Sequence, residues 1–184
     1  MTVIVNVLGG PGVGKSTTAT GVFSRLKQEN VLCEYVNEYP KEIVWEGTNE
    51  LLKNQIHIFA EQLRRQWRLM GKVDFVITDC PILLNLIYFD YWHKQNPTFT
   101  EDYVKLTKEY FLSTFNQFTN VNFYIHRNKP YQEKGRVQTF EEAKTIDEDV
   151  WNLLNFHKIP YQITNSKSSI DDIYAFIKTG KMSL

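Results

Sequence analysis

The residues best suited to chemistry form a glycine-rich loop near the start of the chain. The loop consists of Gly9, Gly10, Pro11, Gly12, Val13, Gly14, Lys15 and Ser16. Its glycines let backbone N–H groups approach phosphate oxygens without interference from a Cβ atom. Lys15 can reach the β- and γ-phosphates of a nucleoside triphosphate, and the Ser16 hydroxyl can bind the accompanying Mg²⁺. The sequence therefore predicts a phosphate-binding P-loop.

The segments around this loop have the character that a P-loop requires. Residues 3–8 are apolar and mostly β-branched, as in a buried strand, and residues 16–27 can continue as a helix. The helix N-terminus adds partial positive charge next to the phosphates. Because strand, loop and helix follow in this order, the pattern indicates triphosphate binding rather than a chance glycine-rich turn. We expect ATP and Mg²⁺ as cofactors, with the nucleotide bound by Gly9, Gly10, Pro11, Gly12, Val13, Gly14, Lys15, Ser16 and Thr17.

Two carboxylates are expected to share the site with the P-loop. Asp79 ends an apolar strand of the Walker B type, where a carboxylate binds Mg²⁺ directly or through water. The alternative role for Asp79 is to cap a helix that begins near Pro81. Glu38 follows the second predicted strand and can accept a proton from an attacking hydroxyl. The alternative for Glu38 is a surface position in a turn before Pro40.

A polar segment over residues 127–139 lacks apolar periodicity and predicts a loop or a short lid. Arginines on a closing loop stabilise charge on a transferring phosphoryl group and exclude water. Arg127 directly follows a strand and is the candidate for a fixed contact, whereas Arg136 is the candidate for a mobile one. An ordinary solvated connection is the alternative. The predicted catalytic residues are thus Glu38, Lys15, Asp79, Arg127 and Arg136, and the predicted metal ligands are Ser16 and Asp79.

A long helix with many polar residues, predicted over residues 49–70, contributes another candidate surface. Gln55, Phe59 and Gln62 recur with the spacing of one helix face, and this face is a candidate lining for an acceptor pocket. The side-chain amide of Gln55 suits the edge of a nucleobase. An ordinary solvated helix surface is the alternative. The four histidines show no metal-ligand spacing, and we assign them no role.

Strands and helices alternate along the chain and indicate an α/β fold. Further strands are predicted at residues 31–36, 75–78, 122–125 and 161–163, with further helices near 82–93, 101–118, from 140 and 169–178. Such alternation predicts a parallel sheet of about five strands with helices on both faces. Ligands of these sheets bind beyond the carboxyl ends of the strands, where Glu38, Asp79 and Arg127 all fall. We predict one P-loop NTPase domain spanning residues 1–184, with a short lid loop.

The composition is that of an ordinary soluble protein and carries no global signal for nucleic acid. Of the residues, 42% are hydrophobic and 23% charged, and 21 basic residues balance 21 acidic ones. A duplex-binding surface normally has net positive charge, although a local basic patch is compatible with a neutral total. With no signal peptide or membrane-length apolar run, a cytoplasmic enzyme without membrane contact is expected. Cys33 and Cys80 fit buried thiols better than a disulfide.

Several segments together resemble a family of small P-loop kinases. They are the P-loop and residues 37–42, 55–62, 78–81, 129–131 and 135–138. These segments are similar to kinases related to the ribosylnicotinamide-kinase domain of NadR, many of them encoded by bacteriophages and labelled AAA-type ATPases. The resemblance implies a nucleoside- or nucleotide-kinase fold, γ-phosphate transfer to a hydroxyl, and the host cytoplasm as location for a phage-encoded protein. Glu38 matches the base of deoxynucleoside kinases, but Cys80 replaces their usual arginine, for which Arg127 or Arg136 is the candidate substitute.

Three functions are compatible with these residues. The first is a kinase whose acceptor is a nucleoside-like small molecule, such as a nucleoside, a nucleoside monophosphate or nicotinamide riboside. The second is a kinase that phosphorylates 5-hydroxymethyluracil in DNA during base hypermodification. The third is an NTPase or switch module, although 184 residues leave little room for the helical subdomain of larger AAA modules. The neutral charge favours the small acceptor over DNA.

Overall fold

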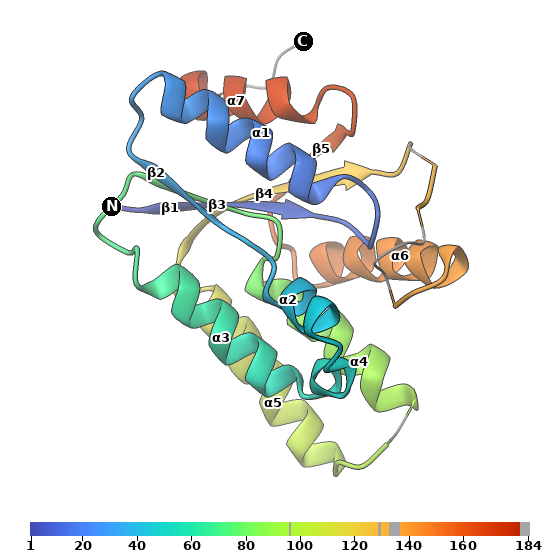
Figure 1. Ribbon diagram of the computed structural model, residues 1–184. Helices are drawn as coiled ribbons and strands as arrows, with labels where there is room; N and C mark the ends of the chain where they lie inside the picture. Colours follow the sequence, from blue (N-terminus) through green and yellow to red (C-terminus); the bar gives the residue numbers. More distant parts are fainter. Residues whose placement is uncertain (96, 129, 133–136, 181–184) are drawn as a thin grey trace.

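A parallel β-sheet with helices on both faces forms the centre of the computed structural model, which describes residues 1–95, 97–128, 130–132 and 137–180 (Figure 1). The strands in this part of the chain are β1 (Val3–Leu8), β2 (Cys33–Val36), β3 (Phe75–Thr78), β4 (Thr119–His126) and β5 (Gln162–Asn165). They lie in the order β2-β3-β1-β4-β5, and every neighbouring pair is parallel. The chain leaves β1 toward one edge of the sheet and leaves β3 toward the other. The carboxyl ends of β1 and β3 therefore flank the crevice in which such sheets bind ligands.

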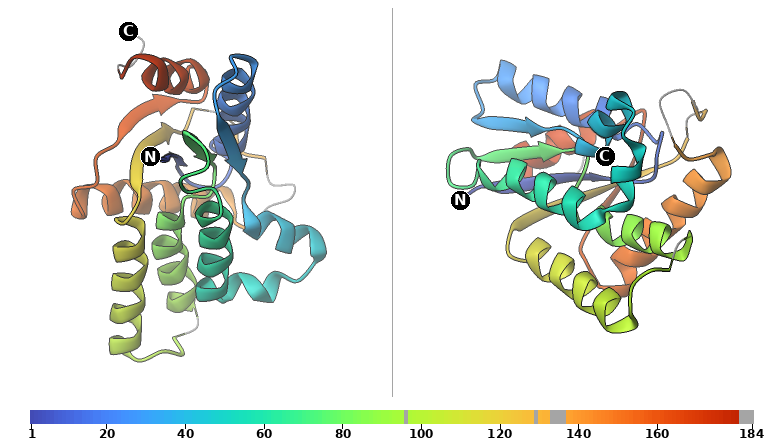
Figure 2. Two further views of the ribbon diagram at one scale, coloured as in Figure 1. Left: turned by 90° about the vertical axis from the view of Figure 1, so that its left-hand side faces the viewer. Right: turned by 60° about the horizontal axis from the view of Figure 1, so that its bottom comes forward.

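The helices divide between the two faces of the sheet. Helices α1 (Lys15–Gln28) and α7 (Ser169–Thr179) cover one face, and α3 (Gln55–Trp67), α4 (Asn85–Gln95), α5 (Glu101–Phe115) and α6 (Phe140–Phe156) lie on the other (Figure 1, Figure 2). Between β2 and α3 the chain forms α2 (Tyr39–Glu46) and a 3₁₀ turn, η1 (Asn49–Lys53), and a further 3₁₀ turn, η2 (Ile82–Leu84), precedes α4. None of the helices in the described ranges is long and apolar enough to span a bilayer.

Side chains of the strands alternate between two hydrophobic clusters, as the two-residue period of a β-strand requires. Val5 and Val7 of β1, with Phe123 and Ile125 of β4, belong to the cluster that includes residues of α1 and α7. The intervening Tyr124 packs with α3, α5 and α6 on the opposite face. Burial on both faces explains why these strands are nearly continuous apolar runs in the sequence.

The predicted α/β fold with a parallel five-stranded sheet is confirmed. Strands β1 and β3 occupy the predicted residues, whereas β4 extends over Thr119–His126 instead of residues 122–125. The two cysteines, Cys33 and Cys80, are buried free thiols, as predicted.

The region between β2 and β3 differs from the prediction. The helix predicted over residues 49–70 is interrupted at Asn54, whose side chain accepts a hydrogen bond from the His57 N–H at 3.1 Å and caps α3. Apolar periodicity does not predict the short helix α2. Its boundaries nevertheless carry ordinary signals, because Pro40 lies in its first turn and Gly47 ends it with φ 73°.

Candidate active site

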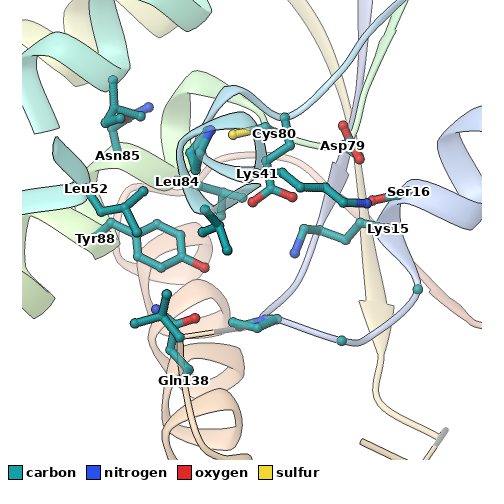
Figure 3. Close-up of a pocket in the computed structure, with 18 of the residues that line it drawn as sticks. Lys15, Ser16, Lys41, Leu52, Asp79, Cys80, Leu84, Asn85, Tyr88 and Gln138 are labelled. Atoms are coloured by element: carbon teal, nitrogen blue, oxygen red, sulfur yellow. The ribbon is translucent and has the colours of Figure 1, made fainter. Parts of the chain in front are cut away.

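A cavity of about 590 Å³ opens at the carboxyl ends of β1 and β3, and Figure 3 shows many of its side chains. Its wall brings together the side chains of Lys15, Ser16, Glu38 and Asp79, to which the sequence assigns chemical roles. The P-loop and the described part of the lid segment also contribute Pro11, Gly12, Gly14, Thr17, Pro130, Gln132, Val137 and Gln138. Three further residues of the predicted nucleotide site are buried and do not line the cavity: Gly9, Gly10 and Val13.

Backbone geometry explains the glycines of the P-loop. Gly14 has φ 108° at the N-cap of α1, a conformation that residues with a Cβ rarely adopt. A Cβ on Gly10 would lie 2.6 Å from Asp147 Oδ1 and 2.7 Å from Ala143 O, so only glycine fits between the loop and α6. Helix α1 has no acidic residue in its first turn, which leaves its positive end available to an anion. Lys15 Nζ donates to Gly10 O at 2.9 Å, which places the ammonium over the loop.

Helix α6 holds the P-loop through Asp147, a residue that sequence reasoning missed. The Gly10 N–H donates to Asp147 Oδ1 at 2.6 Å, and Arg127 Nε donates to Asp147 Oδ2 at 2.5 Å. Arg127 Nη2 also donates to Pro11 O at 2.7 Å, so that loop, arginine and carboxylate form one network. No local sequence pattern marks this contact, because 137 positions separate Gly10 from Asp147.

This network determines where Arg127 lies. The guanidinium lies against the P-loop backbone and is not among the cavity-lining side chains of the described residues. Arg127 therefore supports the loop, and its contact with a transferring phosphoryl group stays a prediction. Arg136 lies outside the described residues. Within the described part of the lid segment, Tyr131 Oη donates to Gln138 O at 2.6 Å, and Gln138 borders the cavity.

Asp79 directly follows β3 and lies beside Ser16 in the cavity wall (Figure 3). The residue is 2% exposed, and its Oδ1 atom has no hydrogen-bond partner among the described residues. The turn η2 begins after Pro81 without a side-chain cap, so the structure does not support the capping alternative. A buried, unpaired carboxylate oxygen near a serine hydroxyl fits Mg²⁺ and its water ligands, and Ser16 and Asp79 would hold such an ion. Burial and the Asp79 carboxylate raise the pKa of the Tyr35 phenol, which stays protonated.

A side chain of α3 fixes the backbone on both sides of Glu38. Gln62 accepts the Tyr39 N–H through Oε1 and donates to Asn37 O through Nε2, each at 3.2 Å. Glu38 lies between these two anchored residues and contributes to the cavity wall. The backbone that carries the Glu38 carboxylate is therefore held by α3 as well as by the end of β2.

Arg65 ties α2 to α3 next to this point. Its guanidinium forms ion pairs with Glu42 of α2 at 2.6 Å and with Glu61 of α3 at 3.0 Å. Arg65 lowers the pKa of Glu42, and hydrogen bonds from Arg64 and Arg65 lower the pKa of Glu61 to about 2. Both carboxylates are therefore ionised at neutral pH. The Glu42–Arg65 pair attaches α2 to α3, and Glu61 holds the Arg65 guanidinium from within α3.

The face of α3 that the sequence predicts as the lining of an acceptor pocket borders the cavity only in part. Gln55 lines the cavity, whereas Phe59 belongs to the hydrophobic core and Gln62 holds the segment around Glu38. The rest of the cavity wall away from the P-loop is mainly apolar and aromatic. It is formed by Val44, Trp45, Leu52, Ile58, Leu84, Tyr88 and Trp92.

Two buried amide oxygens accompany this apolar wall. Gln55 Nε2 donates to Leu52 O at 2.7 Å, and Asn85 Nδ2 donates to Ile82 O at 3.0 Å. These bonds leave Gln55 Oε1 and Asn85 Oδ1 without a partner among the described residues. Both residues line the cavity, with Gln55 4% and Asn85 2% exposed. Two unpaired amide oxygens therefore lie buried in residues that line the cavity.

Tyr88 adds a donor to the same cavity. Its hydroxyl points into the cavity in Figure 3, and burial together with the Glu38 carboxylate raises the pKa of its phenol. The phenol therefore stays protonated at neutral pH. Sequence reasoning missed Tyr88 and Asn85, although their spacing of three positions on a predicted helix was a usable signal that they share a face.

Comparison with protein families matches residues 4–171 to an AAA domain. The chain belongs to this family. Comparison of the chain with curated proteins found no match. Similar solved structures include deoxyadenosine kinase from M. mycoides with bound dATP, with TM-score 0.59 and 14% identity over 96% of this chain and 100% of the other. The same kinase with bound dCTP has TM-score 0.60 and 13% identity, over 97% and 100%. At this identity the likeness shows the fold, which is that of P-loop nucleoside kinases.

The link between α6 and the P-loop of this AAA domain is testable by the substitution Asp147→Ala. The change leaves the Arg127 guanidinium, whose side chain is 12% exposed, without its carboxylate and removes the acceptor for the Gly10 N–H. We expect the free energy of unfolding to fall by about 3 kcal/mol, and the ATP affinity to fall because the loop loses its support.

Chemical denaturation and calorimetric titration with ATP measure these two effects. Glu148→Ala removes a neighbouring exposed carboxylate on α6 and serves as the matched control, with both quantities unchanged. An Asp147→Ala protein that binds ATP as tightly as the unmodified protein would contradict the role of Asp147 in holding the loop.

Proposed function

We propose that this AAA domain transfers the γ-phosphate of ATP to a hydroxyl group of a nucleoside-like small molecule. The observation that carries the proposal is that Glu38 shares one cavity with Lys15, Ser16 and Asp79. A base and a phosphate cradle on the same cavity are the parts that phosphoryl transfer to an alcohol requires. The fold that this chain shares with deoxyadenosine kinase supports the proposal.

In the proposed reaction, Glu38 accepts the proton of the acceptor hydroxyl as its oxygen attacks the γ-phosphorus. The new O–P bond forms while the bond from the γ-phosphorus to the β,γ-bridging oxygen breaks, and ADP leaves with that electron pair. Lys15 and the backbone N–H groups at the start of α1 bind the charged phosphate oxygens. When bound by Ser16 and Asp79, Mg²⁺ supplies further neutralisation of charge on these oxygens.

The cavity wall away from the P-loop supports a planar acceptor that carries hydrogen-bond donors. Trp45 and Trp92, with the aliphatic side chains between them, offer apolar surfaces that suit a heterocyclic ring. We infer that donors of the ligand pair with Gln55 Oε1 and Asn85 Oδ1, because a buried acceptor left unpaired costs about 1–3 kcal/mol. Ring N–H and amino groups of a nucleobase are such donors. We therefore assign the acceptor to nucleosides or their close analogues.

The test is a transfer assay with γ-labelled ATP, Mg²⁺ and a choice of acceptors. One set contains a panel of nucleosides, the second contains DNA with 5-hydroxymethyluracil, and the third contains no acceptor. We expect label in a nucleoside monophosphate and ADP formation that depends on the nucleoside. Label in DNA alone would replace the small acceptor by nucleic acid, and ADP formation independent of any acceptor would indicate an NTPase.

Other details stay predictions from the sequence alone. They are the use of ATP rather than another triphosphate, a cytoplasmic location, and kinship with the NadR-related or bacteriophage kinases. Repeating the transfer assay with GTP in place of ATP tests the first of them.

A further inference from the structure

A second lysine lines the cavity opposite the P-loop. Lys41 lies in the first turn of α2, and its side chain extends toward Lys15 and Ser16 in Figure 3. Among the described residues that line the cavity, Lys15 and Lys41 are the positively charged ones. The two ammonium groups come from different elements, since Lys15 opens α1 and Lys41 belongs to α2.

The position of Lys41 is not explained by the stability of α2. A cation in the first turn of a helix is opposed by the helix dipole, and Lys41 lies in the first turn of α2. Within the described ranges no carboxylate forms a salt bridge with Lys41, and the adjacent Glu42 is paired with Arg65 at 2.6 Å. A residue type that is unfavourable at its position in a helix indicates a functional requirement at that position.

The charge of the transferring phosphoryl group gives a reason for a second cation in the cavity. The transferring phosphoryl group spreads negative charge over its equatorial oxygens, and P-loop enzymes neutralise this charge from more than one side. Cys80 stands directly after Asp79, so this position supplies no cationic side chain. Arg127 uses two of its nitrogen atoms on Asp147 and on the Pro11 carbonyl, and it is not among the described residues that line the cavity.

We propose that Lys41 is a catalytic residue whose ammonium contacts the γ-phosphoryl group during transfer. The assignment rests on the proposed function. The acceptor proton passes to Glu38, the acceptor oxygen bonds to the γ-phosphorus, and the bridging oxygen leaves with ADP. The Lys41 ammonium keeps all of its protons and neutralises charge on the equatorial oxygens throughout. Lys15 reaches the phosphates from the P-loop, so the two lysines approach the same group from two different elements of the cavity wall.

The test compares K41Q and K41R with the unmodified protein in the nucleoside transfer assay. K105Q is the matched control, because it makes the same change at an exposed lysine of α5 outside the cavity. We expect K41Q to lower kcat by roughly 100- to 1000-fold, with KM for ATP nearly unchanged, and K41R to recover most of the loss. The affinity for ADP with fluoroaluminate in the presence of the nucleoside should fall in K41Q, while the affinity for ADP alone stays the same.

The possible failures of the two proposals are distinguishable. An unmodified protein that phosphorylates no nucleoside overturns the proposed function and the role of Lys41 with it. An active unmodified protein whose K41Q variant keeps its kcat overturns the role of Lys41 alone. A rise in KM for the nucleoside at unchanged kcat also overturns it, because Lys41 would then bind the acceptor and not the transferring group.

Discussion

Replacing Glu38 by glutamine is expected to lower kcat for nucleoside phosphorylation by about 1000-fold. The amide has the size of the carboxylate but cannot accept the proton of the attacking hydroxyl. Because Glu38 acts on the acceptor, we expect ATP affinity to change by less than about twofold. Transfer kinetics and calorimetric titration with ATP measure the two quantities separately.

Structural side effects of this substitution should be small, because the backbone around Glu38 is anchored from α3. The bonds of Gln62 to Asn37 O and to the Tyr39 N–H do not involve the Glu38 side chain. Glu46→Gln, at the other end of α2 and outside the cavity wall, is the matched control and should keep full activity. A Glu38→Gln protein with normal kcat would show that another group accepts the proton or that no base is needed.

The parts of the fold that could be predicted from the sequence have signals within a few residues of one another. The P-loop needs only its glycines, Lys15 and Ser16 between an apolar strand and a helix. The start of α6 near Phe140 is equally local, since Thr139 and Glu142 form a capping box with hydrogen bonds of 3.3 and 2.7 Å. The alternation of strands and helices along the chain also predicts that Glu38 and Asp79 lie at the carboxyl ends of parallel strands.

The parts that could not be predicted depend on contacts between distant elements. Asp147 resembles any acidic residue on an amphipathic helix until α6 packs against Gly10 of the P-loop. Arg127 has the sequence position of a phosphate ligand, yet the same packing directs its guanidinium to a carboxylate and a carbonyl. Lys41 is only a polar residue in a short segment until Arg65 attaches α2 to α3 and so places it over the cavity. Such positions follow from tertiary packing, which residue type and spacing do not encode locally.

The largest effect is expected from Lys15→Ala, which should reduce phosphate transfer by at least roughly 1000-fold and weaken ATP binding. Among the described residues, the Lys15 side chain hydrogen-bonds to Gly10 O at 2.9 Å and belongs to none of the hydrophobic clusters. The free energy of unfolding should therefore change by no more than about 0.5 kcal/mol. Transfer assays, titration with ATP and chemical denaturation measure the three effects.

Lys27→Ala is the control on the same helix, because Lys27 lies near the other end of α1 and pairs with Glu34 at 3.1 Å. It should leave transfer and ATP binding intact, so that a loss confined to Lys15→Ala is attributable to the phosphate site. If Lys15→Ala transferred phosphate at the unmodified rate, the loop would not hold the γ-phosphate. Glu38, Asp79 and Lys41 would then share a cavity in which no phosphoryl group is presented to them, and the assignments made for all three would fail together.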